Sequence, residues 1–142
     1  MANIVPDSFK QELFTATHNF STVAGNTFYL SLYTTVTGFS ATGTTNYITT
    51  NEASGTGYTA GGTSLGLAST CTVAQNISFI SYNNATFSTA TLTASCCLIY
   101  NTTQSKKAVV VLDFGGSKTS TNGDFTIQFP TANSTSAVLR IS

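Results

Sequence analysis

The sequence predicts an all-β protein, a two-sheet antiparallel β-sandwich with one short N-terminal helix. Thr and Ser fill roughly a third of the chain, and the branched Cβ of Thr suits the pleated surface of a strand. Only 7% of the residues are charged, where about 25% is usual. Short alternating segments recur between turns rich in Ser, Asn and Gly, as in antiparallel sandwiches. The 142 residues contain no long linker, so a single domain over residues 1–142 is predicted.

The helix is predicted over residues 8–17. Ser8 and Gln11 have the spacing of a capping box, and Glu12 favours the positive end of the helix dipole. Apolar residues recur on one face at helical spacing. The single histidine, His18, lies near the helix end, and we expect a cap or surface group there rather than a catalytic base.

The strands are predicted from period-two alternation and from apolar runs. Residues 91–100 carry the clearest pattern, with Leu92, Ala94, Cys96, Leu98 and Tyr100 on one face. Residues 107–114 are nearly all apolar, which favours a central position. The other predicted strands are residues 27–35, 47–50, 63–73, 77–82, a short strand at Phe87, 124–129 and 137–141.

The loops and the core residues are predicted from the same pattern of polar and apolar residues. Residues 36–47, 51–62 and 115–123 are predicted as loops because they are rich in Gly, Thr and other polar residues. The order of the strands is left open between a jelly roll and an immunoglobulin-like arrangement. The predicted core residues are Leu98, Val110, Leu112, Phe125 and Ile127.

The cysteines predict neither a disulfide framework nor a metal site. The chain has an odd number of cysteines, which favours buried free thiols: Cys71, Cys96 and Cys97. Neighbours in a strand face opposite sides, so Cys96 and Cys97 are not placed to ligate one ion. We therefore expect no metal and no cofactor.

Charge and motifs argue against nucleic acid, membrane and catalysis. Formal net charge is zero with five Lys and Arg, so no basic patch for nucleic acid is expected. No apolar stretch approaches a membrane span, and no secretory signal is expected at the N-terminus. No Gly-x-Ser-x-Gly motif surrounds a serine, and the five carboxylates suggest helix and turn roles. We therefore expect no enzymatic activity.

The stretch at residues 51–62, NEASGTGYTAGG, is the most distinctive in the chain. Four of the eleven glycines fall in it, which indicates a shaped connection. It is similar to a segment that recurs in small structural proteins of tailed bacteriophages. Residues 109–129, VVVLDFGGSKTSTNGDFTIQF, resemble the same proteins, as do FKQELF at residues 9–14 and FYLSLY at residues 28–33.

The resemblance implies a virion structural protein made in the host cytoplasm. The favoured role is a capsid decoration or cement protein on the outside of the head, with the major capsid protein as partner. A homo-oligomer is expected, with a trimer among the candidates. The alternative is a tail-fibre, collar or other tail-associated protein that contacts the host surface, where tyrosines would stack on sugars: Tyr29, Tyr33, Tyr47 and Tyr58.

The predicted interface residues are Glu52, Tyr58 and Tyr47. Residues 51–62 form a loop longer than a simple hairpin turn, and such loops are often functional. Contacts must be apolar, aromatic or hydroxyl-based because charge is scarce. Tyr58 is the expected aromatic anchor, since buried tyrosines often dominate interface energies.

Overall fold

The computed structural model of the chain describes residues 3–142 and contains one helix and seven strands within that range. In chain order the elements are α1 (Asp7–Phe14), β1 (Phe28–Tyr33), β2 (Thr63–Leu65), β3 (Thr72–Ala74), β4 (Ile77–Ile80), β5 (Ala85–Asn101), β6 (Lys107–Ile127) and β7 (Leu139–Ile141).

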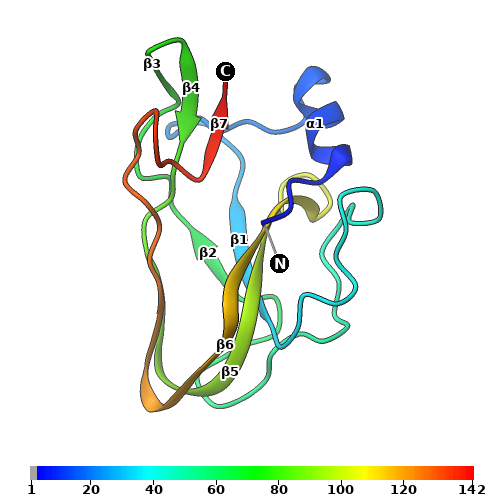
Figure 1. Ribbon diagram of the computed structural model, residues 1–142, viewed down its shortest axis with the longest axis vertical. Helices are drawn as coiled ribbons and strands as arrows, with labels where there is room; N and C mark the ends of the chain where they lie inside the picture. Colours follow the sequence, from blue (N-terminus) through cyan, green and yellow to red (C-terminus); the bar gives the residue numbers. More distant parts are fainter. Residues whose placement is uncertain (1–2) are drawn as a thin grey trace.

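The strands form two antiparallel sheets, which confirms the predicted fold class. One sheet has the order β2-β1-β5-β6 and the other the order β3-β4-β7 (Figure 1). Within residues 3–142, no helix has the length and apolar character needed to cross a membrane.

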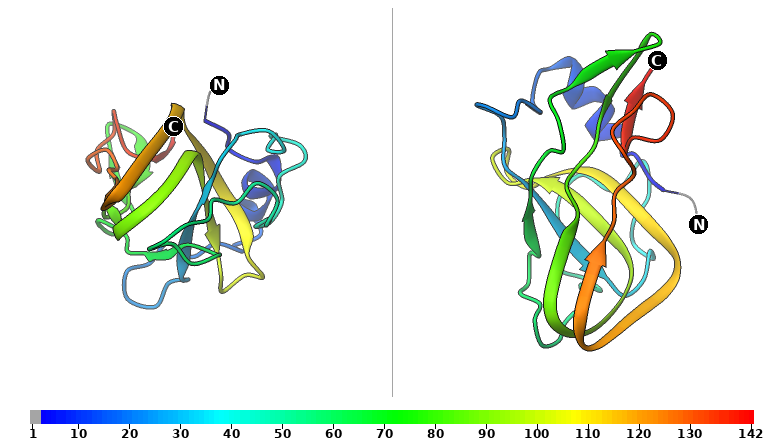
Figure 2. Two further views of the ribbon diagram at one scale, coloured as in Figure 1. Left: turned by 90° about the horizontal axis from the view of Figure 1, so that it is seen from below. Right: turned by 90° about the vertical axis from the view of Figure 1, so that its left-hand side faces the viewer.

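A long bent hairpin of β5 and β6 dominates the architecture. It runs from the pair Asn101–Lys107 at its turn to the pair Ala85–Ile127 at its open end. Both strands bend at the end of the molecule opposite β3, β4 and β7 (Figure 2, right). The register also shifts between the pairs Ala94–Lys118 and Cys96–Asp113, where Gly115 and Gly116 have positive φ. Glycine adopts these conformations without the steric penalty of a side chain.

The bend corrects the prediction of a loop at residues 115–123. β6 is continuous through this range, so the predicted strands 107–114 and 124–129 are one element. The predicted strand 91–100 likewise merges with the short strand at Phe87 in β5. Polar residues can form a strand here because the residues of β6 in this range are mostly exposed to water.

Three smaller boundaries also differ from prediction. Residues 47–50 form no strand, and residues 63–73 are divided between β2 and β3 by an irregular segment. The helix ends at Phe14 rather than at residue 17, and Ser8 does not cap it. The Ser8 hydroxyl instead donates to the Thr44 carbonyl at 3.3 Å, across the loop that follows β1. Tertiary contact thus displaces the predicted capping box.

Apolar side chains gather on both faces of the four-stranded sheet. One cluster lies between the sheets and contains Leu30, Cys97 and Phe125. The other lies on the outer face beneath the loop at residues 34–50 and contains Cys96 and Leu98. Cys96 and Cys97 are therefore buried on opposite sides, as predicted, whereas Cys71 is exposed and corrects the prediction of a buried thiol.

The predicted core is partly confirmed. Leu98, Val110 and Phe125 are buried, while Leu112 and Ile127 are half-buried. The latter two line an open groove described below.

Candidate functional site

The three residues predicted to form an interface meet at the Glu52 carboxylate. The Tyr47 hydroxyl donates to Glu52 Oε2 at 2.7 Å, and the Tyr58 hydroxyl donates to Oε1 at 2.7 Å. The backbone N–H of Gly61 donates to Oε1 at 2.6 Å. Glu52 thus gathers the ends of its own loop through hydrogen bonds to a charged acceptor, which are stronger than neutral ones.

Tyr58 also fastens this loop to β1. Its hydroxyl oxygen accepts the backbone N–H of Leu32 at 3.0 Å, and the Ala53 N–H donates to the Leu32 carbonyl at 2.8 Å. Burial, and then the hydrogen bond to Glu52, raise the pKa of the Tyr58 phenol above its ordinary range. The same two causes raise the pKa of Tyr47. Both phenols therefore remain neutral donors to Glu52.

The glycines of this loop permit its close approach to the sheet. A Cβ added to Gly62, where φ is 78°, would lie 1.7 Å from the Leu30 carbonyl oxygen of β1. Earlier in the loop, Thr56 forms a bridge with Thr91 of β5. The outward side is left with small residues such as Thr59 and Ala60. The interface role of Glu52, Tyr58 and Tyr47 stays a prediction, whereas Tyr33 of the sugar-stacking alternative is completely buried and unavailable for stacking.

A second polar cluster, which the sequence did not predict, joins α1 to the hairpin. Glu12 Oε2 lies 2.7 Å from His18 Nε2, and Glu12 Oε1 accepts from Lys107 Nζ at 2.7 Å. The His18 side chain has no exposed area, which corrects its assignment as a surface group. The only trace of this cluster in the sequence is that Glu12 and His18 lie six residues apart. This spacing does not predict a cluster, because the third member, Lys107, lies far away in the sequence, on β6.

The hydrogen-bond network fixes the tautomer of His18. The backbone N–H of Gln104 donates to Asn101 Oδ1, so the Asn101 amide nitrogen faces His18 Nδ1 at 3.0 Å and Asn26 Oδ1 at 2.8 Å. An amide nitrogen only donates, so Nδ1 accepts and Nε2–H donates to Glu12. Both ring nitrogens are thereby engaged within the chain, and His18 is not placed to take a proton from a substrate.

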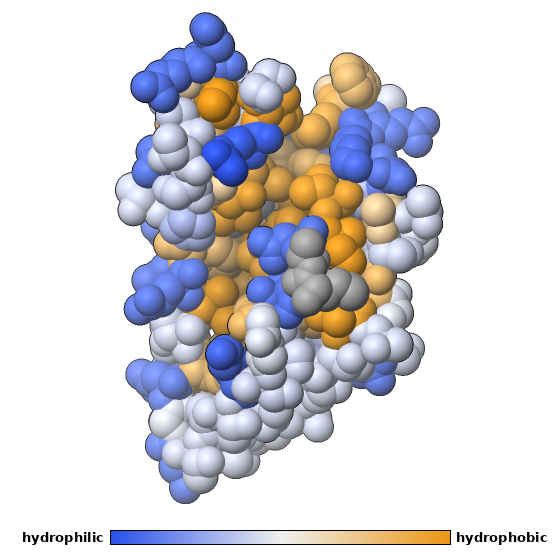
Figure 3. Space-filling model, viewed as in Figure 1, coloured by the Kyte–Doolittle hydropathy of each residue, from blue (hydrophilic) through white to orange (hydrophobic). Residues whose placement is uncertain are grey.

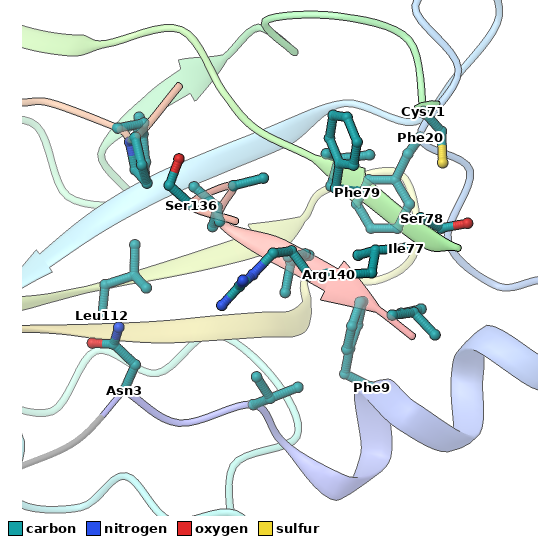
Figure 4. A pocket seen from close by; sticks show the side chains of 18 of the residues that line it. Asn3, Phe9, Phe20, Cys71, Ile77, Ser78, Phe79, Leu112, Ser136 and Arg140 are labelled. Atoms are coloured by element: carbon teal, nitrogen blue, oxygen red, sulfur yellow. The ribbon is translucent and has the colours of Figure 1, made fainter. Parts of the chain in front are cut away.

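An apolar groove of about 1080 Å³ opens between α1, β6 and β7. Figure 3 shows apolar residues gathered in a hollow on this face of the molecule. Figure 4 shows side chains from the helix, the small sheet and β6 around the same space. We call it the apolar groove, and its apolar lining includes Phe9, Leu13, Phe20, Leu112, Phe114 and Leu139.

The charged residues of the groove are few. Lys10 forms an exposed ion pair with Asp7 at 2.7 Å. Arg140 Nη1 donates to the carbonyl oxygens of Ser134 at 3.3 Å and Thr135 at 2.6 Å. Asp113 accepts the Gly115 N–H at 2.9 Å, and this hydrogen bond is the main cause that lowers the pKa of its carboxyl.

Large apolar side chains project into water at the end of the molecule beside this groove. Phe14 is 94% exposed at the end of α1, Val73 is 65% exposed in β3, and Ile141 is 58% exposed in β7. The end of α1, the β3–β4 turn and the end of β7 all lie at the top of Figure 1. We call this region the apolar end, and its three exposed apolar side chains belong to three separate elements.

Among residues 3–142, no three His, Cys, Asp or Glu side chains form a group suited to a metal ion. The chain was also compared with family models, curated proteins and solved structures, and none of them matches.

Proposed function

We propose that the chain is a structural protein of a tailed-bacteriophage virion that decorates the outside of the head. The single observation that carries a docking role is the apolar end, formed by Phe14, Val73 and Ile141. The resemblance of residues 51–62 and 109–129 to phage structural proteins supports the capsid as partner.

Burial of this apolar end would contribute to binding. Removing one large apolar side chain from water stabilises a complex by roughly 1.5–3 kcal/mol. The formal net charge is zero, so no long-range field steers the chain toward a charged partner. We therefore propose that shape and apolar area, and not long-range charge, carry the contact at the apolar end.

The polar clusters support a structural rather than a catalytic role. The Glu52 and Glu12 carboxylates are both occupied by donors from the same chain. Such satisfied networks stiffen a fold and specify its geometry. A stiff scaffold that presents an exposed apolar end suits a protein that cements a shell.

The test is to add purified full-length chain to heads that lack it and to image the particles. Regular density on the shell is expected. Phe14→Ser, at a side chain that is 94% exposed, should leave the melting temperature unchanged but weaken head binding about tenfold or more. Lys118→Ala, an exposed change at the opposite bend, is the matched control and should bind like the unaltered chain. Bare heads, with the protein found only on tails, would replace the proposal by the tail-fibre or collar role.

A further inference from the structure

We propose that the apolar groove receives an extended segment of a partner protein. The segment adds as a strand along the free edge of β7 and places an acidic side chain opposite Arg140. This inference rests on the proposed docking function and specifies where and how the partner binds.

The free edge of β7 supplies the backbone template. β7 pairs with β4 on one side only, in the register Phe79–Arg140, and it is an outer strand of its sheet. The groove borders β7, and α1 lines it as well (Figures 1 and 4). An outer strand presents unpaired N–H and C=O groups, which extended peptides bind by strand addition.

The space beside β7 opens toward α1. No Cα atom of α1 lies within 8 Å of a Cα atom of β7, and both elements are fully described. A strand added to β7 would lie about 4.8 Å from it, on the side away from β4.

The groove lining matches a strand with alternating side chains. Phe9 and Phe20 line one part of the groove, and Leu112 and Phe114 of β6 line another. Successive side chains of a strand point to opposite faces, so every second residue of the segment would contact this apolar lining. The intervening residues would face water and are expected to be polar.

Arg140 determines the charge of the partner. Its guanidinium bonds only neutral carbonyl oxygens, and no ion pair of Arg140 occurs among the described residues. Lys10, the other cation of the lining, is already paired with Asp7. A carboxylate on the incoming segment would form an ion pair with the Arg140 guanidinium, because guanidinium–carboxylate hydrogen bonds are strong and directional.

The binding test uses the isotopically labelled full chain and a synthetic peptide in which Val and Thr alternate around one central Asp. Amide shifts on titration should map to β7 and α1. A peptide with Lys in place of Asp should bind about tenfold more weakly or worse. Arg140→Glu should reverse this preference, and Lys118→Glu, an exposed cation outside the groove lining, should leave it unchanged.

Several outcomes would overturn the groove proposal: no peptide binding, shifts confined to other faces, or equal affinity for the two peptides. If Arg140→Glu fails to fold, the comparison of the two peptides on the unaltered chain still decides. Protection of β7 only by a second copy of this chain would also reject a separate partner protein.

Hydrogen exchange on decorated heads separates this inference from the proposed function. Protection of β7 and α1 on the shell supports both. Decorated heads with protection confined to residues 51–62 retain the docking function and reject the groove. Bare heads, together with peptide binding at β7, reject the capsid role and retain the groove.

Discussion

A single carboxylate, Glu52, determines the shape of the most distinctive loop in the chain. Its oxygens accept from two phenols and one backbone N–H. The loop is therefore an ordered part of the fold, and substitutions that remove a partner of Glu52 should lower its stability. This result changes the expected effect of substitutions at Tyr58, which was expected only as an interface anchor and which also holds its own loop to the sheet.

Tyr58→Phe should lower the free energy of unfolding by about 1–3 kcal/mol. The substitution removes the hydroxyl that donates to Glu52 and accepts from the Leu32 N–H, while the ring contact with Phe87 is retained. Chemical denaturation measures the loss. Tyr29→Phe is the control, because no hydrogen bond is found for the Tyr29 hydroxyl among the described residues, and an equal loss in both variants would contradict the role of Tyr58.

Alkaline pH should destabilise the protein through its buried phenols. Burial raises the pKa of Tyr100 from 10.0 to about 12. Because the folded-state pKa is raised, the stabilisation is fully present below pH 10 and is lost as the pH rises through about 12. Burial acts in the same direction on Cys96, whose pKa is raised to about 12. Unfolding curves collected across this range measure the effect, and stability that is constant up to pH 12 would contradict it.

At the scale of elements, α1 is held to the hairpin by the Glu12–His18–Lys107 cluster. His18→Ala should lower the free energy of unfolding by about 2–4 kcal/mol, because it leaves the buried Glu12 Oε2 without a partner and removes one of the two acceptors of the Asn101 amide nitrogen. Lys10→Ala removes only an exposed ion pair and should cost less than about 1 kcal/mol. Similar losses in the two variants would show that the cluster does not anchor the helix.

Strand patterns in the sequence identified most elements but not the bend. Alternation placed β1, β4 and the second half of β5, and a continuous apolar run placed the first half of β6, which is buried on both faces. The pattern failed where register changes: Leu92 and Ala94 lie in the cluster between the sheets, whereas Cys96 and Leu98 lie in the outer cluster. The irregularity between Ala94 and Cys96 causes this switch, and only pairing with β6 reveals it.

The candidate site was less predictable than the fold. The groove and the His18 cluster each combine elements far apart in sequence, and no local pattern reports such a meeting. Glu52, Tyr58 and Tyr47 lie close together in the sequence, so they could be grouped as candidates. The hydrogen bonds that join their side chains could not be predicted from the sequence.

At the scale of the whole molecule, the core is closed on one side and open at the groove. Leu98 is completely buried, so Leu98→Ala should cost about 2–5 kcal/mol. Leu112 is half-buried and lines the groove, so Leu112→Ala should cost less than about 2 kcal/mol. Thermal and chemical unfolding compare the two, and a larger loss at Leu112 would mean that the groove is closed in solution.

The bent hairpin has a consequence for the order of folding. β5 and β6 meet across a short turn, whereas β1 pairs with residues of β5 that lie far along the chain, from Phe28–Asn101 to Tyr33–Cys96. Closing a long loop costs more chain entropy than zipping a hairpin from its turn. During refolding, the amides of β5 and β6 should therefore gain protection before those of β1, so that the hairpin provides the nucleus onto which both sheets are assembled.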